Sequence, residues 1–414
     1  MKKSSLTEGQ DRNASLRKWT RRSVLQQAAA GMAYAAAVSP SLASAAREWS
    51  PAMSPDRDDY FIIDGVVHCY NHDPVNYRDP VMAGKAGEGG YAYSVHAAVN
   101  PAPYHLTSAQ WARDWQPEEV VDQAFLESDT AMICMHSVPL FTSYFDGLVS
   151  NAKGAYLKSR YPDRVRWYAG IDIMDDPVEV FRLIDQVAQQ GADGIKLYPY
   201  RVNLDTGRPE WWYMDDEVRA FPIFEYAISK GIKHIATHKL IGYEGDKTPY
   251  MKTRDFARAA EAFPEAWFHI VHAGWLFGDE TIEILKRFDN VTAVMEGPMF
   301  WAAFDVPKFT QLLSNYLNEV DLNKIIYASA AANQHPYFVS RAILDYVPPA
   351  DANFKFGEHE KRRIMGENFA DIHGIDIKAQ RKKIAGDKFE MTKARDGMRE
   401  PFSEQRAPGA WQTG

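Results

Sequence analysis

Strand-like and helix-like segments alternate along most of the chain, and this alternation limits the fold more than any other feature. Strands that alternate with helices form a parallel sheet, and eight such strands can close into a barrel. We therefore expect an α/β fold, a (β/α)8 TIM barrel, with an open doubly wound sheet as the alternative. The eight apolar runs of strand length are Phe61–His68, Ala131–His136, Val165–Asp172, Gly194–Pro199, Ile232–His238, Trp267–His272, Val291–Glu296 and Lys324–Ala330.

The segments between these runs carry helical patterns that end in the expected way. Residues 177–190 are followed by Gly191, and residues 221–230 by Gly231. Glycine is the favoured residue just after a helix end. No GxGxxG sequence follows an early run, so a dinucleotide-binding version of the open sheet has no support.

The first 45 residues read as a leader rather than as part of the fold. Residues 20–25 (TRRSVL) hold an arginine pair, an alanine-rich apolar stretch follows, and small residues lead to a cleavage site after Ala45. This order is typical of a twin-arginine signal peptide, so we expect a periplasmic or extracellular protein. The apolar stretch is short for a membrane anchor, and no membrane association is expected after cleavage.

Three further segments are distinguished by composition. The barrel domain is expected over residues 58–377, with a long insertion after the first strand over residues 71–117. Residues 378–414 are polar and charged, and are expected to form a C-terminal tail that packs on a neighbour or stays mobile.

Charge and cysteine content exclude several classes of protein. The leader carries seven basic and two acidic residues, so its removal takes the formal charge from −8 to about −13. Such an acidic chain is not expected to bind nucleic acid. The two cysteines, Cys69 and Cys134, lie in apolar runs and are expected to be buried thiols. The expected partner is a small-molecule substrate, and a homo-oligomer is left open.

Polar residues stand at the carboxyl ends of the predicted strands, which is where an eight-stranded α/β barrel places its active site. Histidine ends four of the eight runs, which packing alone explains poorly. Imidazole is a common metal ligand and general base, and a carboxylate can complete a His/His/carboxylate ligand set. The strand-end residues are His68, His136, Asp172, Lys196 with Tyr198, His238, His272, Glu296 and the loop at residues 329–335.

These segments resemble the amidohydrolase superfamily. The similar branch is the amidohydrolase-related one, which includes aminocarboxymuconate semialdehyde decarboxylase, other nonoxidative decarboxylases and lactone-type hydrolases. The resemblance covers residues 60–377. It rests on the order and spacing of IIDGVVH, ADGIKLYP, IATHK, FHIVHAGW, IIYASA and RRIMGENFADIHGI.

The resemblance implies site residues, but two family positions are changed. The first strand usually reads Asp-x-His-x-His, and Val66 replaces its first histidine between Asp64 and His68. The last strand usually reads Gly-Ser-Asp, and Ala330 replaces its aspartate. Two usual metal ligands are therefore missing, so a two-metal site is not expected.

Two interpretations of this gap stay open. In the first, His68 and His238 hold one divalent metal ion, with zinc preferred, and Glu296 or His335 completes the site. In the second, no metal is bound, and the histidines and Lys196 bind and polarise the substrate directly. The twin-arginine leader favours the first, since that route exports folded, often cofactor-loaded proteins.

We therefore expect an exported hydrolase that cleaves a C–N or C–O bond of a small cyclic or aromatic acid. A nonoxidative decarboxylase and a catalytically inactive ligand-binding barrel are the alternatives. The expected catalytic residues are His272 (general base or orienting group), Lys196 and Asp64, the expected metal ligands are His68, His238 and Glu296, and the expected substrate-binding residues are His136, Asn333 and His335.

Overall fold

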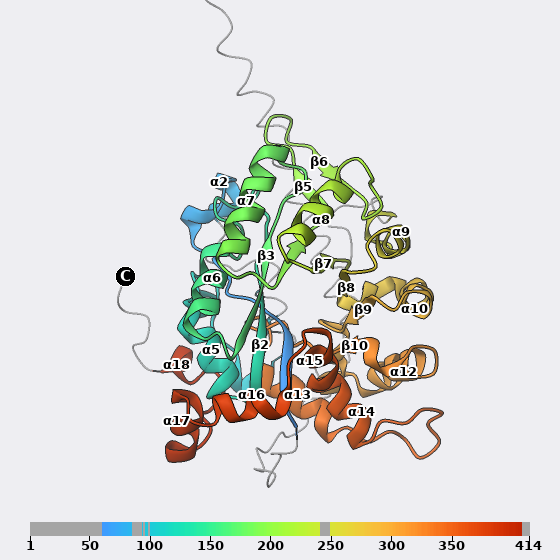
Figure 1. Ribbon diagram of the computed structural model, residues 1–414. Helices are drawn as coiled ribbons and strands as arrows, with labels where there is room; N and C mark the ends of the chain where they lie inside the picture. Colours follow the sequence, from blue (N-terminus) through green and yellow to red (C-terminus); the bar gives the residue numbers. More distant parts are fainter. Residues whose placement is uncertain (1–59, 85–92, 94–95, 98–99, 241–248, 408–414) are drawn as a thin grey trace, which may run out of the picture.

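The computed structural model describes residues 60–84, 93, 96–97, 100–240 and 249–407 (Figure 1). The predicted leader, residues 1–45, lies outside the described residues. Among the described helices, none has both the length and the apolar character needed to span a lipid bilayer.

Eight parallel strands form one sheet that curves into a nearly closed barrel, which confirms the predicted fold. The strand order follows the chain and omits only a short antiparallel hairpin of β5 (Tyr200–Val202) and β6 (Pro209–Trp211). The eight barrel strands are β1 (Ile62–Val67), β2 (Thr130–His136), β3 (Val165–Gly170), β4 (Gly194–Leu197), β7 (His234–His238), β8 (Trp267–Val271), β9 (Val291–Val294) and β10 (Ile325–Ile326).

The barrel closes where β1 meets the chain after β10. The backbone N–H of Gly65 donates to the carbonyl oxygen of Tyr327 at 3.0 Å, and that of Ala330 donates to Val66 at 3.2 Å. A side chain at Gly65 would place its Cβ 2.8 Å from the Tyr327 carbonyl oxygen. Glycine at this position therefore lets the two chain segments approach.

This closure changes the side-chain alternation expected for β1. The register of β1 against β2 shifts between Asp64 and Val67, and Ile63 and Val66 pack in the same apolar cluster. A regular strand would place Asp64, Val66 and His68 on one face, and β1 departs from that alternation. The close approach at Gly65 breaks the two-residue period.

Helices follow most strands and pack around the barrel (Figure 1). The predicted stops are confirmed: α7 and α8 end just before Gly191 and Gly231, which have positive φ angles of 83° and 85°. The longer helices are α5 (Pro117–Phe125), α6 (Asn151–Arg160), α7 (Pro177–Gln189), α8 (Ala220–Ser229), α9 (Phe256–Ala262), α10 (Gly278–Arg287), α12 (Val306–Leu317) and α13 (Pro336–Asp345).

Short helical turns occupy the connections. Those described in the insertion after β1 are η2 (Pro74–Asn76), α2 (Pro80–Ala83), η4 (Ala102–Tyr104) and α4 (Ser108–Trp111), and those after the later strands are η6 (His272–Phe277), η7 (Pro298–Phe300), α11 (Trp301–Phe304) and η8 (Leu322–Lys324). Both cysteines are buried and free, as expected.

The C-terminal segment packs against the barrel, which corrects the expectation of a tail that binds a neighbour or stays mobile. The described part of the predicted tail contains α17 (Lys388–Asp396), α18 (Ser403–Arg406) and nearly all of α16 (Ile377–Ile384). Before it, within the predicted barrel domain, come α14 (Glu358–Arg362), η9 (Arg363–Glu367) and α15 (Asn368–Ile372). The buried guanidinium of Arg164 binds Asp387 at 2.5 Å and Glu390 at 2.9 Å. The polar composition of this segment therefore reflects ion pairs with the barrel.

Glu127 anchors the last described residues. Its buried carboxylate accepts hydrogen bonds from the backbone N–H groups of Phe402 at 2.8 Å and Ser403 at 2.9 Å, and from the Ser403 hydroxyl. The same carboxylate contacts His335 Nε2 at 2.9 Å. One side chain thus joins α5, the chain after β10 and the C-terminal segment.

We predict that Glu127→Gln lowers the free energy of unfolding by about 2–3 kcal/mol, because a neutral amide replaces a buried carboxylate that accepts several hydrogen bonds. Urea unfolding measures the change. The exposed Glu358→Gln is the control and should stay within about 0.5 kcal/mol of the wild type. A loss below about 1 kcal/mol for Glu127→Gln would contradict the role given to this anchor.

Candidate active site

Four of the predicted site residues meet at the carboxyl ends of the barrel strands: His68, His238, His272 and Glu296, called the acid–histidine cluster below. His68 Nε2 lies 3.4 Å from Glu296 Oε1, and His272 Nε2 lies 3.7 Å from Glu296 Oε2. His272 Nε2 also lies 3.1 Å from His238 Nδ1. All four side chains are buried.

Backbone carbonyl groups fix which nitrogen of each ring carries hydrogen. His68 Nδ1 lies 3.0 Å from the carbonyl oxygen of His136, and His272 Nδ1 lies 3.2 Å from that of Glu296. Both Nδ1 atoms therefore donate. In neutral His272 the Nε2 lone pair then accepts a hydrogen bond from the Nδ1–H of His238. His272 therefore orients His238, and its lone pair is occupied by this hydrogen bond.

Unusual backbone conformations occur beside this cluster. His272 and Ala273 have φ angles of 68° and 51°, and Ala330 has a φ angle of 60°. The left-handed region costs a non-glycine residue about 1–2 kcal/mol. Such strain is typical of functional sites, and here it occurs at a residue whose ring lies beside Glu296.

Lys196 and His136 lie fully buried at the ends of β4 and β2. Among the residues that the structure describes, the Lys196 ammonium, both ring nitrogens of His136 and Oε2 of Glu296 make no hydrogen bond. The His136 ring stacks on Tyr168, with 4.7 Å between ring centroids. Buried polar atoms without partners are rare in native proteins, and their concentration here indicates a place for a polar ligand.

Burial and mutual attraction shift the pKa values of these groups. Burial lowers the pKa of Lys196 to about 8, although the charge of Glu296 opposes this. Burial likewise lowers the pKa of His272 to about 4. For Glu296, burial raises the pKa, but His272, His68 and Lys196 outweigh this and bring it to about 2. At neutral pH the site therefore holds a buried cation, a buried carboxylate and a neutral His272.

The predicted metal ligands do not assemble into a complete set. His68 Nε2 and the Glu296 carboxylate face each other, but His238 is hydrogen-bonded to His272. Val66 and Ala330 supply no donor atoms. Within the described ranges, no three His, Cys, Asp or Glu side chains stand close enough together to hold one metal ion. The residues as arranged thus do not fit a metal centre.

The remaining predicted residues have other partners. The Asp64 carboxylate lies between β1 and the chain after β10, where it accepts from the backbone N–H of Ser329 at 2.9 Å and from the Ser329 hydroxyl. Burial raises the pKa of Asp64 to about 7. His335 contacts Glu127 and begins α13, where it accepts from the Tyr337 N–H at 3.2 Å. These contacts are structural.

Asn333 lies nearer the site. Its Nδ2 donates to the Tyr70 hydroxyl at 3.0 Å, and the Tyr70 ring lies 5.1 Å from that of His68.

Several aromatic residues beside the site escaped the sequence analysis. Tyr70 and His72 continue the line of His68 beyond the strand, and Trp111 from the insertion packs on both. Tyr198, which the sequence analysis named with Lys196, stacks on His238 with 4.4 Å between ring centroids. The spacing of His68, Tyr70 and His72, each two residues after the last, could have indicated that these rings lie on one face of an extended chain. It was missed because the apolar run ends at residue 68.

A second group of histidines lies toward the amino-terminal ends of β7 and β8, where His269 is buried and His234 and His373 are partly buried. His269 Nε2 contacts the Tyr168 hydroxyl at 3.2 Å and His234 Nδ1 at 3.1 Å, and the same hydroxyl contacts His373 Nε2 at 2.9 Å. Because these side chains bind one another, they form part of the core.

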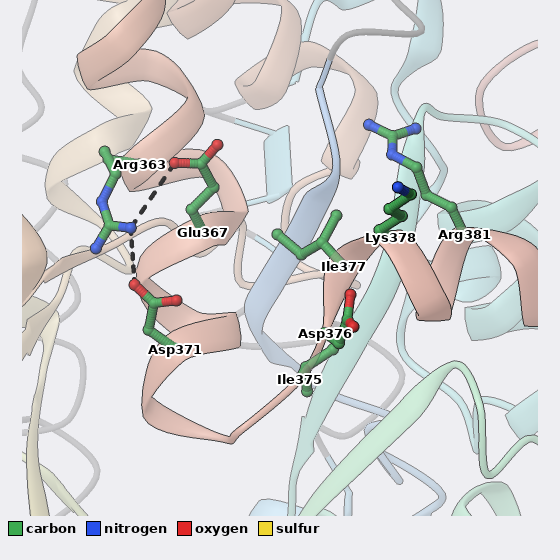
Figure 2. Close-up of a pocket in the computed structure, with 8 residues that line it drawn as sticks. All are labelled: Arg363, Glu367, Asp371, Ile375, Asp376, Ile377, Lys378 and Arg381. Carbon is green, nitrogen blue, oxygen red and sulfur yellow. Dashed lines mark hydrogen bonds and ion pairs between the residues drawn. The ribbon is translucent and has the colours of Figure 1, made fainter.

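The surface near η9 and α16 carries a shallow depression of about 620 Å³ (Figure 2). Its charged lining is already paired in part, since Arg363 binds Asp371 at 2.7 Å and Glu367 at 3.8 Å. η9 packs on the start of β1, where Cβ at Gly366 would lie 1.8 Å from the Phe61 carbonyl oxygen. The depression is therefore at the opposite end of the barrel from the acid–histidine cluster.

Comparisons with solved structures agree with the barrel. An uncharacterized TIM-barrel protein from Bordetella bronchiseptica is 15% identical, with 77% of this chain and 98% of that chain covered and a TM-score of 0.55. A 5-carboxyvanillate decarboxylase from Novosphingobium aromaticivorans, complexed with manganese and 4-hydroxy-3-methoxy-5-nitrobenzoic acid, is 13% identical over 77% and 97% of the two chains, with a TM-score of 0.51. At these identities the likeness shows the fold alone.

Comparison with the curated proteins finds no match. The family model described as Amidohydrolase matches residues 109–374, which run from the insertion after β1 to the end of α15 and contain seven of the eight barrel strands. Because this match covers more than half of the sequence, the chain belongs to the amidohydrolase family.

Proposed function

We propose that this protein is a hydrolase that cleaves a C–N or C–O bond of a small cyclic or aromatic acid. The observation that carries the proposal is the fully buried Lys196 ammonium without a hydrogen-bond partner in the described part of the chain. A buried cation is costly unless it meets an anion, and a substrate carboxylate or a developing oxyanion would supply one.

The protonation states at the site favour hydrolysis over decarboxylation. The lowered pKa values of Glu296 and His272 keep both groups deprotonated at neutral pH. Decarboxylation leaves a carbanion that needs a proton donor, whereas hydrolysis needs a base and an oxyanion partner. The site offers acceptors at His68 and Glu296, and in the proposed complex its cation, Lys196, stabilises the oxyanion, so hydrolysis uses all of these groups. A decarboxylase would instead have to use the Lys196 ammonium as its proton donor.

The proposed step uses only groups of the protein and one water molecule. His68 Nε2 and Glu296 accept the proton of the attacking water, whose oxygen forms a bond to the substrate carbonyl carbon. Lys196 stabilises the oxyanion, and His272 holds His238 in place. The C–O or C–N bond then breaks, and the leaving atom takes up the proton, so that an acid and an alcohol or amine are formed.

Metal dependence remains a separate proposal. A divalent cation, zinc included, would find two ligands at His68 and Glu296, where stable zinc sites use three or four. The step above therefore runs without one.

Export through the twin-arginine route also stays a proposal, supported by the TRRSVL leader, and fractionation of expressing cells would test it.

The reaction is tested by screening the purified mature protein with lactones, amides and carboxylated aromatics. Alcohol or amine release that Lys196→Met abolishes is the expected result. Carbon dioxide release from the carboxylated aromatics, without turnover of lactones or amides, would assign a decarboxylase instead. Ligand binding without any turnover would assign an inactive binding barrel.

We predict that acid binding weakens as the pH rises through about 8, because Lys196 then loses its charge. Calorimetric titration with benzoate at pH 6.5 and pH 9.5 should show at least a tenfold loss of affinity at the higher pH. The loss should be absent in Lys196→Arg, which stays charged, provided that this variant binds benzoate. Equal affinity of the wild type at both pH values would refute the lysine as anchor.

Lys196→Met should stabilise the protein at neutral pH. Lowering the Lys196 pKa from 10.5 to about 8 costs the folded state about 3 kcal/mol. The variant no longer has this cost, but it also loses the attraction between Lys196 and Glu296, so only part of the 3 kcal/mol is gained. The unfolded chain binds the Lys196 proton more tightly than the folded chain does. The loss of folding free energy caused by Lys196 is therefore complete below pH 8 and disappears as the pH rises toward 10.5. Urea unfolding should therefore show Lys196→Met about 1–2 kcal/mol more stable at pH 7 and a smaller difference at pH 10. A variant that is less stable at pH 7 would contradict this.

Chelation separates the two interpretations of the cofactor. After dialysis against a chelator, turnover and benzoate affinity should stay within about twofold of their starting values, because two ligands bind a metal weakly. Elemental analysis before and after dialysis is the control. Loss of turnover that stoichiometric zinc restores would show that a metal is required.

A further inference from the structure

Residues 100–112, the later part of the insertion after β1, lie against the chain that follows β10 and are called the cover segment below. The side-chain amide of Asn100 donates to the carbonyl oxygen of Asn333 at 2.9 Å, and Trp111 Nε1 donates to that of Ala332 at 3.4 Å. The cover segment thus rests on the same part of the chain that closes the barrel.

The cover segment reaches the acid–histidine cluster through a short series of rings. The centroid of the buried Trp111 ring lies 6.0 Å from that of Tyr70, and the Tyr70 centroid lies 5.1 Å from that of His68. Aromatic rings at such distances are in contact. Movement of the cover segment would therefore expose the Tyr70 ring, which lies beside His68.

The C-terminal residues 399–406, called the clasp below, also bind the insertion. Phe402 anchors them: it is fully buried, and its ring centroid lies 5.4 Å from that of His96 and 4.7 Å from that of His335. The φ angle of Phe402, 54°, is costly for a residue with a side chain, and Glu127 holds its backbone N–H at 2.8 Å. Phe402 thus fixes the clasp between the insertion and the barrel.

Contacts at the protein surface join the clasp to the cover segment. The Tyr104 hydroxyl donates to Glu400 Oε2 at 3.0 Å, and the Arg406 guanidinium lies 4.9 Å from the centroid of the Tyr104 ring. Gln110 Nε2 donates to the carbonyl oxygen of Gln405 at 2.9 Å. Glu400 and Arg406 are exposed, and exposed contacts of this kind stabilise a structure only weakly. The cover segment can therefore separate from the clasp while the barrel stays folded.

The buried position of the acid–histidine cluster requires such a movement. His68, His238 and Glu296 each expose 4% or less of their surface, and His272 exposes 9%. A substrate therefore has to displace part of the protein before it can touch these groups.

We propose that the cover segment is a lid over the acid–histidine cluster and that the clasp sets how often this lid opens. In the opening step Tyr104 leaves Glu400 and Arg406, and Trp111 then moves away from Tyr70. The clasp contacts the lid and not the cluster, so weakening it should change the rates of substrate entry and exit rather than the affinity. The inference goes beyond the proposed function, because it holds for any small molecule that binds the cluster.

Hydrogen exchange of the mature protein, followed by mass spectrometry, tests the lid. The double variant Glu400→Ala/Arg406→Ala removes both side chains that contact Tyr104. Residues 106–112 should then exchange about fivefold faster, because two surface contacts together contribute about that factor. Exchange in β2 should not change. Arg395→Ala, at an exposed position on α17, is the control and should exchange like the wild type.

Stopped-flow measurement of benzoate binding gives a second readout. In the double variant both the association rate and the dissociation rate should rise about fivefold, while Kd stays within about twofold of the wild-type value. A clasp that only supported the site would instead lower the affinity and leave the association rate unchanged.

Three results would overturn the inference. Equal exchange of residues 106–112 in the double variant and the wild type would show that the clasp does not hold the cover segment. Faster exchange with unchanged benzoate rates would show that the substrate enters elsewhere, and a loss of affinity at an unchanged association rate would assign a supporting role. If benzoate does not bind the wild type, the Lys196 anchor of the proposed function fails, and the exchange result alone decides about the lid.

Discussion

The candidate site is organised around a buried charge, the Lys196 ammonium, which makes no hydrogen bond within the described part of the chain. Lys196 stands at the end of a central barrel strand, where burial holds its pKa near 8 and only the more distant charge of Glu296 favours its protonated form. A core optimised for stability alone would replace this lysine by an apolar residue. It stands with the Glu296 carboxylate and with two His136 nitrogens that make no hydrogen bond to any described residue, and a ligand that binds these groups best explains its presence.

Contacts from several parts of the molecule hold this site in place. Gly65 lets β1 close against the chain after β10, which brings His68 within 3.4 Å of Glu296. Farther out, Lys153 donates to the carbonyl oxygens of Cys69 and Trp115 at 3.2 and 2.8 Å and so supports the extended chain that carries Tyr70. Glu127 fastens the C-terminal segment to the chain after β10. Residues far apart in the sequence thus hold the groups at the barrel mouth.

The sequence predicted the features that follow from periodicity. All eight strands, the glycine stops of α7 and α8, and the meeting of His68, His238, His272 and Glu296 could be read from it, because the carboxyl ends of parallel strands converge. Local alternation failed at Asp64, since the close approach at Gly65 depends on a strand more than 250 residues away. The tail was also predicted wrongly, because Asp387 and Glu390 look like solvent-exposed charges in the sequence but bind Arg164, and the backbone of Phe402 and Ser403 binds Glu127.

The Lys196 side chain itself gives the most direct test of the central claim. The Cε resonance of Lys196, assigned by its absence in Lys196→Met, can be followed by NMR through a pH titration with and without benzoate. Our account predicts a pKa near 8 in the free protein and a higher pKa when the acid is bound, because the carboxylate stabilises the ammonium. A pKa near 10.5 that benzoate leaves unchanged would contradict it.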